Sequence, residues 1–239
     1  MMSIAFISDL HLEPIENSKL KTFYDLLLRA QSEFNSLYII GDLFEYWIGD
    51  DDRNPINKNI IQNIKNATDN GLNIFLIHGN RDFLLGSKFE EMTGIQIIDD
   101  MTVIEDKFCK IMVSHGDVFC TDDIEYQKLK KTLRSEQWIE NFLSKTIEER
   151  IDFANQLRSQ SAESSSNKAE NIMDVNMAYV NEIIDKNKID ILIHGHTHRP
   201  AIHKLDSGAS RAVLGSWENN EGWIIEYKQG NIELKSFPL

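Results

Sequence analysis

The chain has 239 residues, of which 41% are hydrophobic, and its 25 basic and 38 acidic side chains leave a net charge of −13. This length is ample for one large domain with a packed core, and the composition excludes a disordered or fibrous protein. The acidic balance argues against a dedicated nucleic-acid-binding protein, because such proteins neutralise phosphates with Lys and Arg.

The two cysteines, Cys109 and Cys120, are too few for an extracellular disulfide scaffold, so we expect reduced thiols in a cytosolic protein. No secretory signal precedes the first apolar run, and no apolar stretch approaches the roughly 18 residues of a membrane-spanning helix. We therefore expect a protein that is soluble or rests on a membrane surface.

Short apolar runs alternate with amphipathic segments through the first two-thirds of the chain. Five runs, rich in Ile and Val and bounded by polar or glycine residues, predict buried strands at Ile4–Ile7, Leu37–Ile40, Asn73–Ile77, Lys110–Val113 and Asp190–Ile193. Helical spacing of apolar residues predicts helices at Lys19–Ala30, Asn57–Thr68 and Asn171–Lys186. Later alternating runs predict antiparallel strands at Gly222–Tyr227 and Ile232–Phe237. The pattern indicates an α/β core completed by β-strands, in one domain over residues 1–239.

Residues 121–169 interrupt this alternation. Apolar residues in helical positions, followed by a Ser-rich segment at Ser159–Ser166, predict an inserted helical cap beside the main sheet. The segment is nearly neutral, so the rest of the chain carries almost all of the negative charge.

Side chains that commonly bind metal ions follow each of the five predicted strands. Ligand sites of open α/β sheets lie at the carboxyl ends of the strands, so we expect these side chains to meet. In chain order they are Asp9, His11, Asp42, Asn80, His115, His196 and His198.

The spacing and chemistry of these side chains favour a centre of two metal ions. Residues two apart on a chain that leaves a strand, such as Asp9 and His11, point to one side and can bind a single ion. Carboxylate, amide and imidazole ligands together suit Mn²⁺, Fe²⁺ or Zn²⁺ better than Ca²⁺. Seven ligands exceed the need of one ion, and one bridging carboxylate fits the count for two. Such a pair of ions holds a hydroxide and stabilises displacement at phosphorus.

Each of these motifs alone has an ordinary structural explanation. An Asp-x-His sequence is commonly a surface or capping feature, and Gly-Asp or Gly-Asn-Arg-Asp after a strand is commonly a turn. Five motifs in order at five strand ends leave little room for that explanation. For the other histidines we expect packing or support of the ligands at His78 and His194, and an edge position at His203.

The ordered set of D-x-H, GD, GN, H and GHTH motifs over residues 9–198 resembles the calcineurin-like metallophosphoesterases. This resemblance implies a four-layer αββα sandwich of two mixed sheets, with two divalent ions bridged by Asp42. The other ligands of the first ion would be Asp9, His11 and His198. Those of the second ion would be Asn80, His115 and His196.

Longer motifs are similar to one branch of this family, the UDP-2,3-diacylglucosamine pyrophosphohydrolases of lipid A biosynthesis in Gram-negative bacteria. They lie at residues 8–12, 41–52, 78–86, 120–123, 172–176 and 194–201. The resemblance implies hydrolysis of UDP-2,3-diacylglucosamine to UMP and 2,3-diacylglucosamine 1-phosphate, with Mn²⁺ as the metal. A hydroxide that bridges the two ions would attack the uridine-side phosphorus.

The same resemblance implies the catalytic and substrate-binding residues. Asp42, Asn80 and Arg81 would be catalytic, and Asn80, Arg81 and His196 would contact the phosphates. Many relatives have His where this chain has Arg81, which can clamp phosphate oxygens but is a poor proton donor. The sugar and acyl chains would contact Asp123, Ser161, Ser165 and Lys168, although the branch often has Asn in place of Ser165.

Parts of the cap have two interpretations. Its apolar residues are individually explained by helix packing, and as a group they form a candidate groove for acyl chains. The basic run Lys128–Arg134 is ordinarily a solvated helix face, and attraction to anionic headgroups is the alternative for an enzyme that handles a lipid. The resemblance places the protein in the cytoplasm, peripherally on the cytoplasmic face of the inner membrane. The acidic run Asp50–Asp52 is more typical of loops and helix capping than of a further metal site.

Two other functions are alternatives to a lipid pyrophosphohydrolase. A metallophosphoesterase for another phosphodiester or nucleotide would share the metal ligands, although the net charge and the apolar cap disfavour nucleic acid. A non-catalytic scaffold with the same fold would be expected to lose ligands, and none of the seven is lost here.

Overall fold

The first of two sheets contains six strands in the order β11-β10-β1-β2-β3-β4. The computed structural model describes residues 2–167 and 174–239, and the side chains of these residues except 160–167. Strands β1, β2, β3 and β4 run parallel, each paired with the next. Strand β10 runs antiparallel to both of its neighbours, β1 and β11. The strands are β1 Ser3–Ile7, β2 Ser36–Ile40, β3 Asn73–Ile77, β4 Gln96–Ile97, β10 Glu221–Lys228 and β11 Asn231–Pro238.

The second sheet contains five strands in the order β5-β6-β7-β9-β8. Its three central strands are parallel, and an antiparallel strand pairs at each edge. The strands are β5 Thr102–Glu105, β6 Lys110–Ser114, β7 Ile191–His194, β8 Ala201–Lys204 and β9 Ser210–Val213.

Alternation of side chains along the strands explains why the two sheets pack face to face. In β1, Ile4 and Phe6 are buried in the layer between the two sheets, together with residues of β6 and β7. The intervening Ala5 and Ile7 point to the opposite face and are buried against helices.

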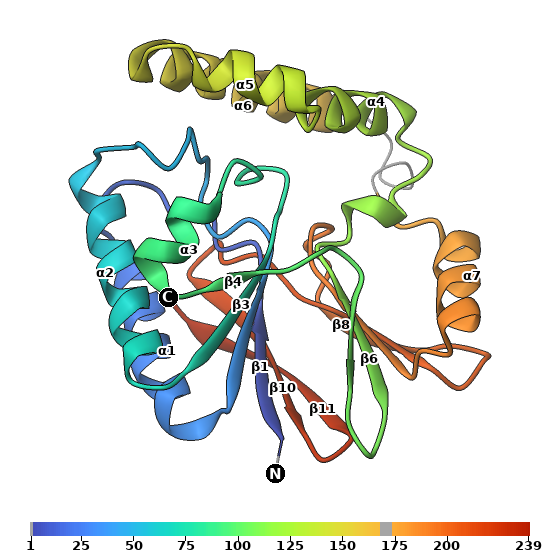
Figure 1. Cartoon of the computed structure of the whole chain (residues 1–239). Coiled ribbons are helices and arrows are strands. Elements are labelled where there is room, and N and C mark those ends of the chain that lie inside the picture. The colour runs from blue at the N-terminus through green and yellow to red at the C-terminus, as the bar shows by residue number, and fades with distance from the viewer. Residues whose placement is uncertain (1, 168–173) are drawn as a thin grey trace.

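Helices cover both outer faces of the sandwich (Figure 1). Helices α1 (Ser18–Glu33), α2 (Pro55–Asp69) and α3 (Ser87–Thr93) pack on the first sheet. Helix α7 (Met177–Asn187) packs on the second sheet, where Val180 and Ile184 are buried with Leu192 of β7. The order of helices, sheet, sheet and helix confirms the four-layer sandwich.

Three further helices lie across the carboxyl ends of the strands, at the top of Figure 1. They are α4 (Ile124–Leu133), α5 (Glu136–Leu143) and α6 (Ile147–Asn167), which together are called the cap below. A one-turn helix, η1 (Asp117–Phe119), leads from β6 toward them. No helix among residues 2–167 and 174–239 combines the length and apolar character that a membrane crossing requires.

The acidic run after Asp42 serves loops and helix starts, as expected. Asp50 accepts hydrogen bonds from the backbone N–H of Gly86 and Phe89, where α3 begins. Asp51 forms a two-pronged ion pair with Arg150 of α6, at 2.7 and 2.6 Å.

All five strands predicted as buried runs are present as β1, β2, β3, β6 and β7, with bounds within one residue of the prediction. The helix predicted at Asn171–Lys186 is wrong at residues 174–176, because α7 begins at Met177, and the first three residues of the predicted helix lie outside the described part of the chain. The side chain of Asn176 accepts a hydrogen bond from the Tyr179 N–H and so caps the helix there. Val175 is buried beside the helix without being part of it. Cys109 and Cys120 are not joined by a disulfide bond.

Candidate metal centre

The seven predicted ligands lie at the carboxyl ends of five parallel strands that belong to the two sheets. Asp9 and His11 follow β1, Asp42 follows β2 and Asn80 follows β3. In the second sheet, His115 follows β6, and the loop after β7 carries His196 and His198. The two sheets meet at this edge, so their loops approach one another under the cap (Figure 1).

An unusual backbone conformation turns five of these side chains toward a common point. Left-handed φ angles occur at Asp9 (52°), His11 (48°), Asp42 (53°), His196 (65°) and His198 (54°). Such angles are uncommon for residues other than glycine and persist where the surroundings enforce them, typically at functional sites. These loops are therefore shaped to present their side chains.

Two glycines permit the close approach of the loops. A Cβ on Gly79 would lie 2.0 Å from Asp42 Oδ1, and a Cβ on Gly195 would lie 2.2 Å from Asp9 Oδ2. No side chain fits at such distances, so any residue other than glycine would displace a predicted ligand.

The ligand atoms form two adjoining groups. The side chains of Asp9, His11 and His198 offer atoms that all lie within 4.8 Å of one another, and so do those of Asp9, Asp42 and His115. Asp42 Oδ2 lies 3.9 Å from His11 Nε2 and 3.8 Å from His115 Nε2, and is thus placed between the groups.

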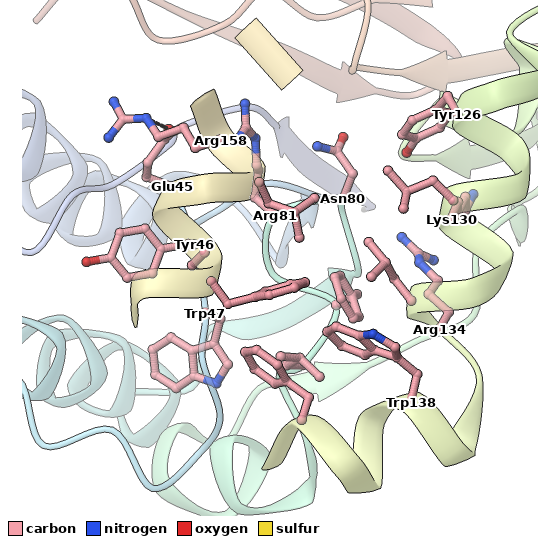
Figure 2. Close-up of a pocket in the computed structure, with 18 residues that line it drawn as sticks. Glu45, Tyr46, Trp47, Asn80, Arg81, Tyr126, Lys130, Arg134, Trp138 and Arg158 are labelled. Carbon is pink, nitrogen blue, oxygen red and sulfur yellow. Dashed lines mark ion pairs between the residues drawn. The ribbon is translucent and has the colours of Figure 1, made fainter. Parts of the chain in front are cut away.

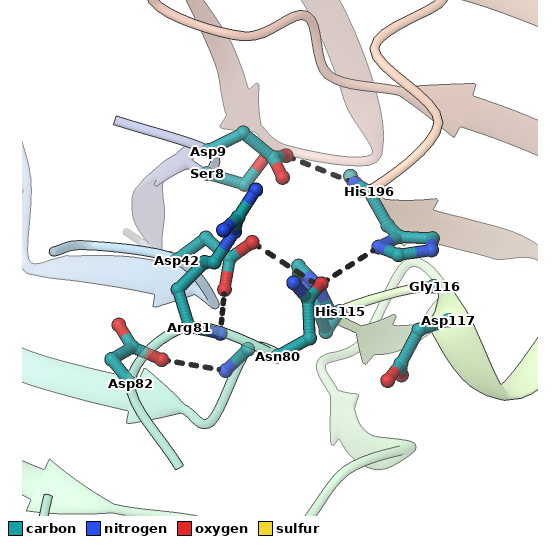
Figure 3. Close-up of polar contacts among 12 residues, drawn as sticks. Ser8, Asp9, Asp42, Asn80, Arg81, Asp82, His115, Gly116, Asp117 and His196 are labelled. Carbon is teal, nitrogen blue, oxygen red and sulfur yellow. Dashed lines mark hydrogen bonds and ion pairs between the residues drawn. The ribbon is translucent and has the colours of Figure 1, made fainter. Parts of the chain in front are cut away.

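The amide of Asn80 completes the second group. Its Oδ1 atom lies 3.1 Å from His115 Nε2 and 3.1 Å from His196 Nδ1 (Figure 3). All seven predicted ligands are therefore brought together at one place.

The buried ligand atoms show that this donor set fits cations. Asp9 Oδ1 and His11 Nε2 are buried and make no hydrogen bond within the part of the chain that the structure describes, and His198 Nε2 lies 3.3 Å from Asp9 Oδ1. A cation among these atoms would compensate the buried carboxylate charge. Oxygen and imidazole ligands in this number suit divalent ions of the first transition row.

The protonation of the histidines points the same way. Burial lowers the pKa of His115, but the carboxylates of Asp42, Asp117 and Asp9 outweigh burial and raise the pKa to about 9. Burial and the neighbouring His115 lower the pKa of His196 to about 3. A proton on His115 thus partly offsets an excess of carboxylate charge, and a divalent cation would displace that proton.

Hydrogen bonds behind the ligands orient their rings. His115 Nδ1 lies 3.1 Å from the Ile40 carbonyl oxygen, so this nitrogen donates and Nε2 is left for a cation. Glu45 Oε2 lies 3.1 Å from His11 Nδ1 in a similar position. The buried Asp82 accepts the backbone N–H groups of Gly79 and Leu43 and joins two ligand-bearing loops.

The other two histidines near the site lie behind the ligands. Burial and the charge of Arg211 lower the pKa of His194 to about 4, so this imidazole is neutral. Its Nδ1 lies 2.9 Å from the Gly195 carbonyl oxygen, and Arg211 Nη1 lies 3.1 Å from its Nε2. His78 contacts the Leu85 carbonyl oxygen.

Arg81 stands where the metal centre meets the cap. Its backbone N–H donates a 2.8 Å hydrogen bond to Asp42 Oδ1 (Figure 3). Its side chain lines an open cleft of about 600 Å³ over the ligands, which is called the metal cleft below. The buried Nε atom has no hydrogen-bond partner among the described residues. Asp123, at the start of α4, also lines this cleft.

A second pocket, called the apolar pocket below, lies under the cap (Figure 2). Aromatic and aliphatic side chains line it, and Trp138 stacks on Phe142 with ring centres 4.8 Å apart. Tyr126 and Lys130 of α4 and Arg134, the residue after that helix, reach toward it opposite Glu45 and Arg158 (Figure 2). Five residues line both this pocket and the metal cleft: Glu45, Asn80, Arg81, Tyr126 and Arg158.

The basic run Lys128–Arg134 is only partly a solvated face. Lys130 pairs with the buried Asp117 at 2.8 Å, and Arg134 donates to the Gly79 carbonyl oxygen at 2.8 Å. Lys128 and Lys131 are exposed. The helical period of α4 explains the division, because residues three or four apart share one face.

Three predicted substrate contacts fall where the structure gives no side chains. Ser161 and Ser165 belong to helix α6, of which the structure describes only the backbone at these positions. Lys168 lies outside the described residues. Conversely, sequence reasoning gave no role to Glu45, Asp117 or Tyr126, although all three stand within or beside its motifs.

Comparison with known proteins agrees with this geometry. The family model of calcineurin-like phosphoesterases matches residues 2–200. The chain is 39% identical over 241 residues to a UDP-2,3-diacylglucosamine hydrolase of Marinobacter nauticus, covering 100% of this chain and 99% of the relative. It is 39% identical over 242 residues to the protein of that name in Salmonella paratyphi B, with 100% of both chains covered.

Among solved structures, an archaeal phosphodiesterase matches over 100% of both chains with a TM-score of 0.54 and 15% identity, which shows a shared fold. The curated relatives match over their full length, the family model matches most of the chain, and the proposed ligands lie together. These findings lead to one conclusion. The chain belongs to the calcineurin-like phosphoesterase family and is a metal-binding hydrolase, similar along its whole length to UDP-2,3-diacylglucosamine hydrolases.

Proposed function

We propose that this chain hydrolyses the pyrophosphate bond of UDP-2,3-diacylglucosamine to UMP and 2,3-diacylglucosamine 1-phosphate, a step of lipid A biosynthesis. The observation that carries the proposal is the shared wall between the metal cleft and the apolar pocket. A substrate that occupies both must carry phosphates next to a large apolar group. The compound named for the 39% identical relatives has this property.

The ligand roles in this proposal follow the two groups of atoms. Asp42 would be a ligand of both ions, supported by its position between His11 and His115. Asp9, His11 and His198 would hold one ion, and Asn80, His115 and His196 would hold the other. When bound, the two divalent ions, which we propose to be Mn²⁺, supply a nucleophile derived from water and compensate phosphate charge.

Arg81 holds the phosphates in this scheme. Its guanidinium stays charged at every working pH, so it stabilises charge on phosphate oxygens and does not deliver a proton. Water attacks the uridine-side phosphorus. With attack at this phosphorus, the bond to the bridging oxygen breaks, the lipid 1-phosphate leaves as a stable phosphate anion and UMP keeps the water oxygen, so cleavage needs no strong general acid. Asn80 and His196 touch the same phosphates, supported by their contact with each other through Asn80 Oδ1.

The cap holds the lipid half of the substrate, as a subdomain inserted in the single domain. Asp123 is the sugar contact that the described side chains support, because it lines the metal cleft beside the first cap helix. Ser161, Ser165 and Lys168 are the other proposed contacts. The acyl chains lie in the apolar pocket, between Trp138 and Arg81.

The experiment is hydrolysis of UDP-2,3-diacylglucosamine with Mn²⁺ in ¹⁸O-labelled water, by the wild type, Asp42→Ala and the matched surface variant Asp206→Ala. Expected is metal-dependent release of UMP that carries the label, abolished in Asp42→Ala and unchanged in Asp206→Ala. Label in the lipid phosphate would overturn the site of attack. A metal-loaded wild type that cleaves a simple phosphodiester or DNA but leaves the lipid intact would overturn the substrate.

A further inference from the structure

A small cleft adjoins the metal cleft. Polar and charged side chains line it together with Pro200, Ala201 and Val213, and it is called the Arg211 cleft below; the polar ones are Asp174, Thr197, Arg199, His203 and Arg211. Its volume is about 260 Å³, against about 600 Å³ for the metal cleft. Thr197 and Arg199 line both clefts, whereas none of the five residues shared with the apolar pocket lines the Arg211 cleft. The metal cleft thus adjoins the apolar pocket by one wall and the Arg211 cleft, with its charged side chains, by another.

Two hydrogen-bond donors of the Arg211 cleft are unused within the described residues. Arg211 is 8% exposed, and its Nη1 atom donates to His194 while its buried Nε atom has no partner. The buried Thr197 hydroxyl has no partner either, although it stands between the ligands His196 and His198. Buried donors without acceptors are unfavourable, so a ligand with acceptor oxygens would relieve both.

The cleft also brings together Asp174, from the motif at residues 172–176, and Arg199, from the motif at residues 194–201, neither of which the metal centre explains. Asp174 of the first motif pairs with Arg199 of the second at 2.5 Å. The Asp174 carboxylate is 32% exposed, so it offers an acceptor to a ligand beside the two unused donors. The cleft therefore presents donors and one anionic acceptor over a small area.

We propose that the Arg211 cleft binds the uracil ring of the substrate, an inference that rests on the proposed function. In that substrate the two phosphates lie between the acylated sugar and the nucleoside. With the phosphates in the metal cleft and the acyl chains in the apolar pocket, the polar nucleoside reaches the other adjoining space. Uracil presents two carbonyl oxygens on either side of an N–H group. Thr197 and Arg211 donate to the oxygens, and Asp174 accepts the N–H.

This arrangement selects uracil over cytosine. Cytosine has an unprotonated ring nitrogen where uracil has N–H, and that lone pair would face the Asp174 carboxylate. Replacing Asp174 by Asn removes the repulsion and supplies an amide that can donate to the cytosine nitrogen.

The test compares three substrates: UDP-2,3-diacylglucosamine, its CDP counterpart and bis(p-nitrophenyl) phosphate, which has no nucleobase. The proteins are the wild type, Asp174→Asn, Thr197→Val and the matched control Asp206→Asn, an exposed acid in the turn after β8. We expect the wild type to favour the uridine substrate by at least about tenfold in kcat/KM. Each cleft variant should lose about tenfold on that substrate, the effect of one buried hydrogen bond, and Asp174→Asn should narrow the preference. Asp174→Asn should cleave bis(p-nitrophenyl) phosphate at the wild-type rate, and the control Asp206→Asn should be unchanged on all three substrates.

Equal rates of the wild type on the uridine and cytidine substrates would overturn the inference. So would variants that keep full activity on the uridine substrate, or an Asp174→Asn variant that loses equally on bis(p-nitrophenyl) phosphate, since that loss marks a structural role. Failure of the proposed function looks different, because the wild type would then cleave bis(p-nitrophenyl) phosphate and neither lipid. In that case calorimetric binding of UMP against CMP decides the inference, and equal affinities would reject it.

Discussion

Glu45 is the residue through which the cap reaches His11, one of the proposed metal ligands. One of its oxygens lies 3.1 Å from His11 Nδ1, and the other lies 2.8 Å from Arg158 Nε on α6 (Figure 2). A carboxylate in this position fixes the orientation of the imidazole and makes its other nitrogen a better ligand. Arg158 in turn keeps the Glu45 carboxylate in place.

We predict that Glu45→Gln weakens metal binding about 10-fold to 100-fold, the usual effect of removing such a carboxylate. Calorimetric titration of the metal-free protein with Mn²⁺ measures the change. Glu91→Gln, which alters an exposed acid of α3, is the matched control and should bind as the wild type does. Unchanged affinity in Glu45→Gln would show that His11 is oriented without this contact.

The clustering of the seven proposed ligands could be predicted from the sequence, whereas the contact of Glu45 with His11 could not. The ligand motifs are local, with partners two residues apart or glycines beside them, so each motif is visible by itself. Glu45 and His11 are 34 residues apart, and a pairing beyond the strand ends joins them. Leu12 pairs with Phe44, and the Glu45 N–H donates to the Leu12 carbonyl oxygen. The spacing of residues in the sequence does not predict a contact over this distance along the chain.

At the scale of elements, the attachment of α6 depends on Arg150. This side chain is 3% exposed, pairs with both oxygens of Asp51 and donates to the Ile48 carbonyl oxygen at 2.7 Å. Asp51 and Ile48 belong to the loop that follows Asp42. The ion pair therefore connects a cap helix to a loop of the metal centre.

Removal of this connection should loosen the helix. We predict that Arg150→Ala speeds amide hydrogen exchange in α6 roughly 30-fold, because charged hydrogen bonds of this kind contribute about 2 kcal/mol. Mass spectrometry of peptides from residues 147–159 gives the rate. The control Lys145→Ala changes an exposed residue just before α6 and should leave exchange as it is. Protection equal to that of the wild type would mean that apolar packing alone holds the helix.

The elements themselves differ in how far sequence predicts them. Buried strands such as Ile4–Ile7 are apolar throughout and end at polar residues, so their limits are visible. The start of α7 is not visible in the sequence, because the helical spacing of apolar residues includes Val175, which lies before the helix. The helix begins at Met177, after the capping side chain of Asn176. The backbone N–H of Asn176 instead donates to the Phe119 carbonyl oxygen. A tertiary hydrogen bond therefore decides that boundary.

At the scale of the whole molecule, charge is distributed so that the cap suits a membrane surface better than the core does. The chain carries −13 overall, but the cap segment is nearly neutral. Lys128 and Lys131 are exposed on α4, next to the exposed apolar side chains of Ile124 and Leu129. Lys130 and Arg134 are engaged inside. The peripheral association with the cytoplasmic face of the inner membrane that the resemblance implies would therefore depend on these two lysines and their apolar neighbours.

We predict that the double variant Lys128→Gln/Lys131→Gln binds anionic vesicles roughly 30-fold more weakly at low salt, since each basic residue near such a surface contributes about 1 kcal/mol. Cosedimentation with phosphatidylglycerol vesicles measures the affinity, and salt should remove the difference because the attraction is screened. Lys186→Gln/Lys188→Gln, at the exposed end of α7, makes the same change in net charge away from the cap. Equal weakening in both pairs would assign the attraction to net charge alone. Loss confined to the cap pair would place the cap against the lipid, on the side from which the acyl chains enter the apolar pocket.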